Sequence, residues 1–441
     1  MFYQRPFDDP RSHQVQDIAA TVVHLKNSNF LPFVYMANAI EEAIPMHSVV
    51  DPRSGKLVHY LSDTKLMARK YAYDVSPWTR YIAGAAKVSD EISLGFVMET
   101  ENQVMQHLES HLSDGKGRKM SKSLGNVISP DDVLKKYGVD ILRLWVVASD
   151  YYDDLKLDNS ILSAQTDSYR RIRNTFRYLI GNLDGFIKEE KIDFDQFPDL
   201  EKFILHRLWE INKIIKKCVD TYDFHLMFTT ILNFCSNDLS SFYFDIRKDT
   251  IYCESILSNK RRASRTLLDI LFNYLVRWLA PSLPFTCEEA WQSRGNKFSI
   301  HLENFLTADP KFKNDDLNNK WKKIRNIRKV ITGALEKKRS EKIIGSSLEA
   351  HADVYINDEY KSIDQNIDIA EISITSSANL LSTSSINSKI ILDSHFNNED
   401  IQGVSVVIKK AEGSKCQRCW KILQEVKDNS LCTRCNDVIN L

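Results

Sequence analysis

The chain has 441 residues, of which 59 are basic and 59 acidic, so its formal net charge at pH 7 is +0. Hydrophobic residues make up 43% and charged residues 27%, which is typical of a soluble globular protein, and the length predicts several domains. The even charge excludes a uniformly basic nucleic-acid binder but leaves local basic patches open. The sequence holds no apolar run of about eighteen residues and no secretory signal, so we expect no membrane span and a cytoplasmic location.

The first part of the chain, residues 1–113, carries few structural signals. Residues 30–44 have the apolar spacing of a helix, and residues 55–62 have the pattern of a short strand. The histidines of this segment lack the spacing of metal ligands, so solvated or core histidines are the simpler interpretation. We can assign no chemistry to this part of the chain and leave it as an unassigned domain.

A loop rich in glycine, lysine and serine follows at residues 114–130, which read DGKGRKMSKSLGNVISP. Glycines on both sides of Lys119 and Lys122 give the backbone conformational freedom. A lysine is a point charge on a long flexible stem, which suits contact with a polyphosphate as charge develops on it. Composition alone leaves an ordinary basic surface loop equally open.

A helix is predicted directly after this loop. Ser129 suits the N-cap position, Pro130 suits the first helical position, and the two aspartates that follow favour the positive end of the helix dipole. Gly138 is expected to end this helix because glycine readily adopts the left-handed backbone of a helix terminus. A second helix should begin just after it.

From about residue 160 to residue 293 the apolar period is helical almost throughout. Long amphipathic segments with short connections predict a helical bundle, and a further short helix follows the prolines near its end. The four long segments cover residues 161–183, 201–222, 224–246 and 260–280.

The pattern of charged and apolar residues changes after the predicted bundle. Residues 320–342 carry ten Lys or Arg against two Glu on a helical pattern, and a solvated helix face explains such a charge run as well as a binding face does. Short alternating or β-branched runs then predict strands of a small α+β unit. These expected strands cover residues 352–357, 369–377, 388–394 and 404–410.

The eight cysteines form two groups. Cys218, Cys235, Cys253 and Cys287 are isolated in apolar helical sequence, where we expect buried free thiols. The other four form two Cys-x2-Cys pairs separated by twelve residues, namely Cys416, Cys419, Cys432 and Cys435. Four thiolates complete the tetrahedral shell of Zn²⁺ and leave no position for water, so the spacing predicts one structural zinc ion.

Basic residues lie among these cysteines, and Trp420 adds a flat apolar face. Such a combination suits a small nucleic-acid contact, although a plain surface patch explains it equally well. The basic residues are Lys415, Arg418, Lys421 and Arg434.

The sequence KMSKS, followed by LGN and a proline, is similar to the second signature of class I aminoacyl-tRNA synthetases. Further segments resemble bacterial isoleucyl-tRNA synthetase in the same order, and the resemblance covers residues from about 114 to 441. They read KKYGVDILRLWVVASDYYDD, YRRIRNTFRYLIGNL, NDLSSFYFDIRKDTIY, APSLPFTCEEAW, IGSSLEA and KCQRCW…LCTRC. A valyl or leucyl relative is a weaker alternative, because the C-terminal four-cysteine unit disfavours it.

The resemblance implies a role for each part. In this family the KMSKS loop closes over ATP, which is used with Mg²⁺, so Lys122 and Lys119 would bind ATP with support from Ser121, Ser123 and Asn126. The bundle would be the anticodon-binding domain. Its contacts with the phosphates of the isoleucine tRNA would come from the basic helix 320–342 and from Arg170, Arg171, Arg173 and Arg177. Lys415 and Arg418 of the zinc finger would add to the tRNA contact.

The resemblance also implies a fold that is mainly α-helical, and a monomer. The expected domains are the unassigned segment 1–113, the KMSKS loop and end of a class I catalytic domain at 114–160, the anticodon-binding domain at 161–345, a small α+β subdomain at 346–405, and the four-cysteine zinc finger at 406–441.

One departure from the family pattern concerns the catalytic half. A class I synthetase needs a His-x-Gly-His type signature before KMSKS, and residues 1–113 contain none. They are also too few for a catalytic half with an inserted editing domain. We therefore expect no complete catalytic set and no ligase activity from this chain alone. The alternative is a stand-alone tRNA-binding module without ligase activity.

Overall fold

The computed structural model describes residues 46–50, 57–61, 112–118, 120–149, 155–361, 363, 367–382 and 395–440. The chain divides into two compact units, each assembled from segments that are far apart in the sequence. The first unit comprises Met1–Ile180, Ile211–Cys235 and Leu271–Thr307, and the second comprises Gly181–Glu210, Ser236–Ile270 and Ala308–Leu441.

Short strands and two helices begin the first unit. Strands β1 (Met46–Val50) and β2 (Leu57–Leu61) pair in antiparallel fashion, which confirms the strand predicted at residues 55–62. The helix predicted at residues 30–44 lies outside the described residues. Strands β3 (Leu112–Ser113) and β4 (Leu155–Lys156) pair in parallel. Helices α7 (Pro130–Tyr137) and α8 (Val139–Ala148) lie between these two strands in the sequence.

The boundaries of α7 follow the capping rules. The Ser129 side chain accepts a hydrogen bond from the backbone N–H of Asp132, and Pro130 occupies the first turn. Gly138 ends the helix with φ of 87°, a left-handed conformation that favours glycine, and α8 begins at the next residue. Each of these predictions is confirmed.

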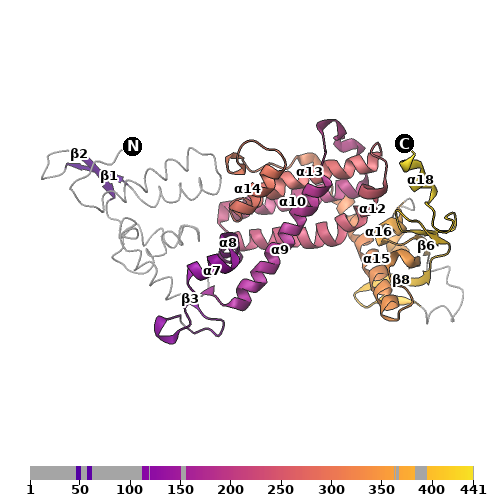
Figure 1. Ribbon diagram of the computed structural model, residues 1–441, viewed down its shortest axis with the longest axis horizontal. Helices are drawn as coiled ribbons and strands as arrows, with labels where there is room; N and C mark the ends of the chain where they lie inside the picture. Colours follow the sequence, from indigo (N-terminus) through magenta and orange to yellow (C-terminus); the bar gives the residue numbers. More distant parts are fainter. Residues whose placement is uncertain are drawn as a thin grey trace. The chain divides into compact units, whose positions relative to one another are not determined.

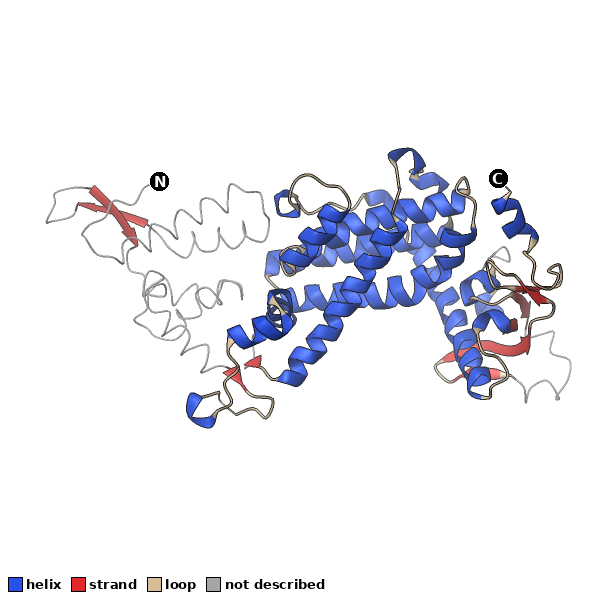
Figure 2. Cartoon of the chain, viewed as in Figure 1, coloured by secondary structure: helices blue, strands red, loops and turns tan. Residues whose placement is uncertain are grey.

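Long helices form most of the described chain, which confirms the mainly α-helical fold (Figures 1 and 2). They are α9 (Asn159–Asn182), α10 (Asp199–Thr221), α11 (Phe224–Asn233), α12 (Asp245–Cys253), α13 (Asn259–Leu279), α14 (Pro284–Ser293) and α15 (Asp315–Ser340). Short 3-10 turns are η2 (Lys122–Leu124), η3 (Lys188–Glu190), η4 (Phe194–Gln196), η6 (Ile300–Leu302), η7 (Pro310–Phe312), η8 (Ser347–Glu349) and η9 (Asp358–Tyr360). None of the described helices combines the length and apolar character that a membrane-spanning helix needs.

The sequence predicts one regular helix over residues 224–246, but the structure has three successive helical segments there. Between α11 and α12 the backbone of η5 (Phe234–Phe244) is a π-helix. Aromatic side chains at both ends of this segment are buried, so packing rather than the amphipathic period sets its winding. The spacing of apolar residues in the sequence cannot distinguish a π-helix of this kind from an α-helix.

Aromatic side chains form the centre of each unit. In the first unit Phe272 packs against Phe176 at a ring-centroid distance of 6.1 Å and stacks on Trp291 at 6.3 Å. In the second unit Phe203 stacks on Trp321 of α15 at 5.5 Å, and Phe242 meets both rings edge-on. Aromatic pairs of this geometry stabilise a core beyond their buried area.

A four-stranded sheet and α15 form the C-terminal part of the second unit. The strand order is β6 (Ser377–Ser382), β5 (Ala350–Ile356), β8 (Ile401–Lys410) and β7 (Phe396–Asn398). β5 runs parallel to β6, whereas β8 is antiparallel to both of its neighbours. Helix α15 contacts β5, β7 and β8, so the small α+β unit is confirmed (Figure 1).

Two of the predicted strands, at 352–357 and 404–410, correspond to β5 and β8. The strand predicted at residues 369–377 is wrong, because this segment begins with the short helix α16 (Ile369–Ser373). Asp368 caps the helix by accepting from the N–H of Glu371, and Ile374 ends it with φ of 58°. The local cap therefore overrides the β-propensity of the isoleucines. The strand predicted at 388–394 lies outside the described residues.

Several basic side chains of α15 are already paired within the second unit. Lys320 contacts Asp199 at 3.0 Å, and Arg325 contacts Asp238 at 2.5 Å. Arg328 and Lys329 make longer contacts with Asp245 and Asp400. Part of the helix's positive charge is thus neutralised by the chain itself.

A buried ion cluster joins α10, α12 and α16 in the second unit. Arg247, only 3% exposed, donates two hydrogen bonds to Glu201 at 2.6 and 2.8 Å and one to Glu371 at 2.8 Å. Tyr243 also donates to Glu201, and Lys260 donates to Glu371. Despite its burial, the two carboxylates hold the pKa of Arg247 above its usual range, so the guanidinium stays charged.

Candidate functional site

The four cysteines of the C-terminal cluster come from two turns of one small finger, residues 414–440. Cys416 follows strand β9 (Ser414–Lys415), which pairs in antiparallel fashion with β10 (Ile422–Leu423), so the first Cys-x2-Cys pair lies in the hairpin between them. Cys432 is the N-cap of helix α18 (Thr433–Ile439), and Cys435 lies in its first turn. Each pair therefore sits at a tight turn that can direct both sulfurs to one point.

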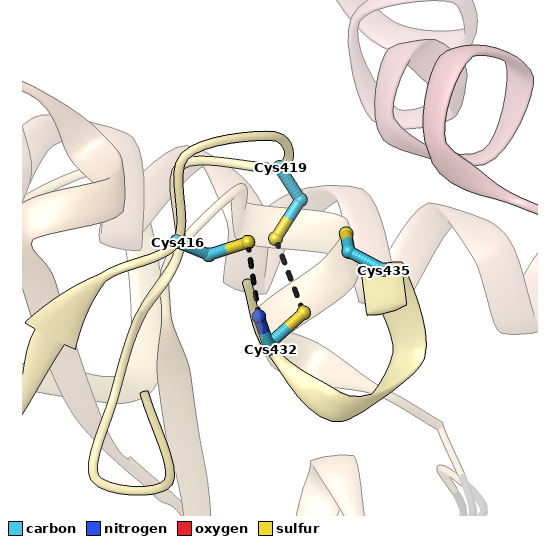
Figure 3. A group of neighbouring side chains, drawn as sticks. All are labelled: Cys416, Cys419, Cys432 and Cys435. Atoms are coloured by element: carbon cyan, nitrogen blue, oxygen red, sulfur yellow. Dashed lines mark hydrogen bonds between the residues drawn. The ribbon is translucent and has the colours of Figure 1, made fainter. Parts of the chain in front are cut away.

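The structure brings all four sulfurs together, and Figure 3 shows them converging from the two turns. All lie within 4.8 Å of one another, all four residues are buried, and none forms a disulfide. The Sγ atoms of Cys419 and Cys432 are 3.8 Å apart, and the N–H of Cys432 donates to Sγ of Cys416 at 3.3 Å. The predicted clustering of these cysteines is confirmed.

Two backbone conformations shape the first turn. Trp420 has φ of 65°, and its N–H donates to the carbonyl of Cys416 at 3.0 Å. Gly413 has φ of 114°, and a Cβ at that position would lie 2.2 Å from the carbonyl oxygen of Leu423. The hairpin can close only because residue 413 has no side chain. Both conformations are specific to the turn that presents the sulfurs.

Cys416, Cys419 and Cys432 lie in surroundings that shift the pKa values of their thiols in different directions. Burial alone would raise the pKa of Cys416, but backbone N–H groups of Cys419, Cys432 and Arg418 donate to its sulfur and lower the pKa to about 6. Burial raises the pKa of Cys419 and of Cys432. One thiolate thus forms easily, while further negative charge in the cluster is opposed unless a cation offsets it.

This donor set fits a closed tetrahedral metal site. Four sulfurs with no carboxylate or histidine among them form a soft ligand shell, which suits Zn²⁺ rather than Mg²⁺ or Ca²⁺. A shell of four protein ligands leaves no open position for a substrate. The arrangement is therefore suited to hold the fold of the finger rather than to carry out a reaction.

The finger is attached to helix α12 by two arginines. Arg418 donates to the backbone carbonyls of Cys253 and Tyr252 at 2.8 and 3.2 Å. Arg434 forms two hydrogen bonds with Asp249 at 2.5 and 2.8 Å, and these hold the pKa of Arg434 above its usual range. Two of the four basic residues noted in the sequence thus hold the finger in place.

Cys253 belongs to the same buried cluster as the four finger cysteines, which the sequence did not indicate. Burial raises its pKa to about 11, so it remains a neutral thiol beside the site. No local pattern could have revealed this neighbour, because it lies on α12, far from the finger in the sequence. The expectation that it is a buried free thiol is confirmed.

The lysine loop, residues 114–130, is organised by its own polar side chains. The Asn126 side chain accepts from the N–H of Ser121 at 2.9 Å and donates to Asp114 at 3.3 Å. The hydroxyl oxygens of Ser121 and Ser123 lie 3.1 Å apart. These hydrogen bonds therefore hold the loop conformation.

One apolar side chain anchors this loop in the first unit. Met120 is 3% exposed and packs in a cluster with Trp145, Leu157 and other residues. Lys119 lies outside the described residues, and for Lys122 the structure describes the backbone alone, at the start of η2. The ATP-binding role of these two lysines, with Ser121 and Ser123, stays a prediction.

The arginines predicted to meet tRNA lie along α9 of the first unit. Arg171 and Arg177 are exposed and have no ion-pair partner among the described residues. Arg170 pairs with Asp167 at the surface, at 3.2 Å. Arg173 is partly buried, where it contacts Glu289 at 3.2 Å and donates to Tyr169 at 3.1 Å. Arg171 and Arg177 are therefore the two most available for an external phosphate.

Comparison with protein families identifies two regions of the chain. Residues 201–356 match the family described as the anticodon-binding domain of tRNA ligase. Residues 98–158, which include the lysine loop, match the class I tRNA synthetases of the I, L, M and V group. This second match begins upstream of residue 114, where the resemblance was expected to start.

Curated proteins similar to this chain carry the name isoleucine–tRNA ligase. The protein from Pelagibacter ubique is 48% identical over 315 residues, 70% of this chain and 33% of its own length. Those from Gluconobacter oxydans and Agrobacterium fabrum are 44% and 45% identical over 74% of this chain. The chain spans about a third of the length of these relatives.

Proposed function

Since this chain belongs to the isoleucyl-tRNA synthetase family, we propose that it forms the tRNA-binding portion of an isoleucine–tRNA ligase. The observation that carries the proposal is the match of residues 201–356 to the anticodon-binding domain of tRNA ligases. The partner is the isoleucine tRNA, and the reaction of the complete ligase uses isoleucine and ATP with Mg²⁺. We place the protein in the cytoplasm as a monomer.

The lysine loop supplies the ATP contacts in this proposal. Lys122 contacts the phosphates as pyrophosphate leaves, Lys119 supports it, and Ser121 and Ser123 fix the loop around Asn126. Such a contact lowers the barrier only when the substrates are already aligned. The sequence of residues 1–113 offers no His-x-Gly-His half-site for that alignment. We therefore expect no isoleucine-dependent ATP–pyrophosphate exchange from this chain alone.

A direct assay of ATP–pyrophosphate exchange tests this part. Exchange by the 441-residue chain above a no-isoleucine control would overturn it. When a complete catalytic half is present on the same chain, Lys122→Ala should lower exchange on the order of a hundredfold, the scale for one preorganised transition-state contact. Lys119→Ala should lower it less.

The tRNA contacts in this proposal come from basic residues of α9 and, separately, of the finger. Arg171 and Arg177 of α9 contact phosphates, with Arg170 and Arg173 adding charge beside them. In the finger Lys415 is exposed, whereas Arg418 makes its contribution mainly by holding the turn against α12. One Zn²⁺ held by Cys416, Cys419, Cys432 and Cys435 keeps this turn folded.

Binding of an isoleucine tRNA transcript across a salt series tests the tRNA proposal. With several phosphate contacts, affinity should fall by about ten- to a hundredfold between 50 mM and 200 mM salt. The variant Arg171→Ala with Arg177→Ala should weaken binding and flatten the salt dependence, whereas Arg261→Ala, on α13 with its guanidinium bonded to a backbone carbonyl, is the matched control. A flat salt response of the unaltered chain contradicts the proposal.

The second candidate is a stand-alone tRNA-binding module without ligase activity. The absence of a His-x-Gly-His motif from the sequence favours it. The two candidates differ in one measurement, because both predict tRNA binding. If adding a separate catalytic half restores exchange, the chain is part of a ligase; if tRNA binds but no catalytic half restores exchange, the module is the better description.

A further inference from the structure

A serine, a histidine and an aspartate meet on one face of the four-stranded sheet of the second unit. His351 and Asp353 are alternate residues of β5, so both point to the face opposite the buried apolar residues of this strand. On the neighbouring strand β6, the parallel register places Ser377 and Asn379 directly beside them. Lys409 of β8 lies beside His351 on the other side. These side chains form the His351 cluster, which is separate from the lysine loop and from the finger cysteines.

Hydrogen bonds join three of these side chains in a row. The Nδ1 atom of His351 lies 2.7 Å from Oγ of Ser377, and its Nε2 atom lies 3.0 Å from Oδ1 of Asp353. An ionised Asp353 can only accept, so Nε2 carries the ring proton and Nδ1 is left to accept from the Ser377 hydroxyl. The row therefore has the order of nucleophile, base and orienting carboxylate that activates a serine for acyl transfer.

Two further donors keep the carboxylate of Asp353 charged and fixed. Lys409 donates to it at 2.7 Å and Asn379 donates to it at 2.9 Å. Burial alone would raise the pKa of Asp353, but the hydrogen bonds from Lys409, Asn379 and His351 hold this pKa below its usual range. A fixed negative charge at Nε2 stabilises the imidazolium that forms when His351 takes a proton from a serine.

The hydroxyl of Ser377 is the exposed end of this row. Ser377 lies at the start of the edge strand β6 and is exposed, whereas His351 is partly buried and Asp353 is buried. Among the described residues, the Ser377 hydroxyl bonds to His351 alone. The adjacent Ser376 shows the ordinary structural alternative, because its buried hydroxyl donates to the backbone carbonyl of Leu348. Ser377 can thus meet a reagent from solvent while it stays bonded to a base.

The rate gain that such a cluster can supply defines the class of reagent. A positioned general base speeds attack by a hydroxyl about 10²- to 10⁴-fold, and each oxyanion donor contributes roughly a further 10²- to 10³-fold. The His351 cluster supplies the base, but its side-chain donors, Lys409 and Asn379, bond to Asp353. Attack on an amide needs oxyanion donors as well, because its leaving group is poor. The cluster therefore suits an acyl group on a good leaving group, as in an aryl ester.

We propose that Ser377 is an acyl-acceptor site for activated esters, with His351 as its general base and Asp353 as the positioning residue. Oγ of Ser377 attacks the carbonyl carbon, a new C–O bond forms, and the bond from this carbon to the leaving oxygen breaks. The hydroxyl proton passes to Nδ1 of His351 and from there to the departing oxygen. The products are an ester on Ser377 and a free phenol. This site is independent of the proposed tRNA function.

Incubation of the full chain with p-nitrophenyl acetate tests the proposal. Nitrophenol should appear in a burst close to the concentration of the chain, and peptide mass spectrometry should find the acetyl group on Ser377. His351→Ala should slow this acetylation by about a hundredfold, at the lower end of the range for one general base, and added imidazole should restore it. Asp353→Asn no longer fixes the Nε2–H tautomer and should slow it by about tenfold or more, whereas Asp353→Glu should recover part of the rate.

Ser241 is the matched control within the same unit. It is exposed, but its hydroxyl donates to the backbone carbonyl of Asn237 and has no base beside it. Acetylation of Ser241 should be slow and should not respond to His351→Ala. Ser377→Ala should abolish the burst, and Ser241→Ala should leave it unchanged.

Two results would overturn the proposal. If Ser377 is acetylated no faster than Ser241, the His351 cluster only ties the strands together. If His351→Ala is folded and leaves the rate at Ser377 unchanged, or if imidazole does not rescue it, His351 is not the base. Circular dichroism and the unfolding midpoint check the fold of each variant. Ser377→Ala changes an exposed edge position, so it gives a reading even if a variant of the buried Asp353 does not fold.

Discussion

The lysine loop and the finger are both short polar segments with glycine-dependent turns, but they are held in different ways. In the loop, Asn126 bonds to Ser121 and Asp114, which are close neighbours in the sequence. In the finger, Arg434 reaches Asp249 on α12, and the sulfurs of Cys416 and Cys432 come from separate turns. Local hydrogen bonds and one buried anchor, Met120, hold the first segment, whereas polar contacts with a distant helix hold the second.

The two kinds of contact have different consequences for how far each segment can move. A loop whose polar contacts lie within itself can open while the neighbouring helices stay folded, although the buried Met120 has to leave its apolar cluster or remain as the anchor. A finger attached to distant helices is fixed in place, and its buried sulfurs can carry negative charge together only where a cation offsets it. The loop is therefore suited to move over a substrate, and the finger to present a rigid surface.

Removal of one finger sulfur is the largest test of this contrast. Cys432→Ser should abolish zinc binding and unfold residues 414–440 locally, because the free energy of binding zinc, about 10–16 kcal/mol in small zinc domains, is folding free energy there. Metal analysis and hydrogen exchange measure the two effects. Cys218→Ser, which alters a buried thiol outside the finger, should leave zinc content unchanged.

The buried carboxylate of Glu201, which pairs with Arg247 of α12, provides the next test. Glu201→Ala leaves the buried Arg247 with Glu371 as its remaining carboxylate partner, and we expect a loss of about 3 kcal/mol in the free energy of unfolding. Denaturant unfolding measures this loss. Lys248→Ala breaks the exposed pair with Asp245 and should cost less than about 1 kcal/mol. Equal effects of the two variants would contradict the role given to the buried cluster.

In the lysine loop the corresponding change is smaller and local. Asn126→Ala removes the hydrogen bonds with Ser121 and Asp114 and should destabilise the closed loop by about 1–2 kcal/mol. Trypsin should then cleave within residues 114–130 faster, while global unfolding stays the same. Asn174→Ala, at an exposed position of α9, should leave the cleavage rate unchanged. A shift of the global unfolding midpoint would show that the loop is not independent.

The smallest expected effect is at the contact between the finger and α12. Asp249→Asn keeps the shape of the side chain but removes one of the two charges that pair with Arg434, the other being Glu254. Because both side chains are about a third exposed, we expect a loss of about 1 kcal/mol. Zinc should stay bound, and exchange of amide hydrogens in α18 should become faster. Loss of zinc in this variant would mean that the attachment, rather than the thiols, controls the metal site.

Periodicity and capping signals in the sequence were sufficient for most helices. Ser129, Pro130 and Gly138 specify the start and end of α7 through local hydrogen bonds and backbone preference. The strands β5 and β8 also follow their apolar patterns. Prediction failed at residues 369–373, where Asp368 caps a helix, and at 234–244, where core packing produces a π-helix.

Spacing along the chain determined the grouping of Cys416, Cys419, Cys432 and Cys435, because two residues between cysteines bring both sulfurs to one turn. Only the tertiary structure decided what surrounds that group. Arg418 and Arg434 were noted as basic residues, but their contacts with α12 depend on chain segments far apart in the sequence. The same holds for His351 and Ser377, which meet across β5 and β6. Local physics sets turns and caps, whereas contacts between distant segments exist only once the chain has folded.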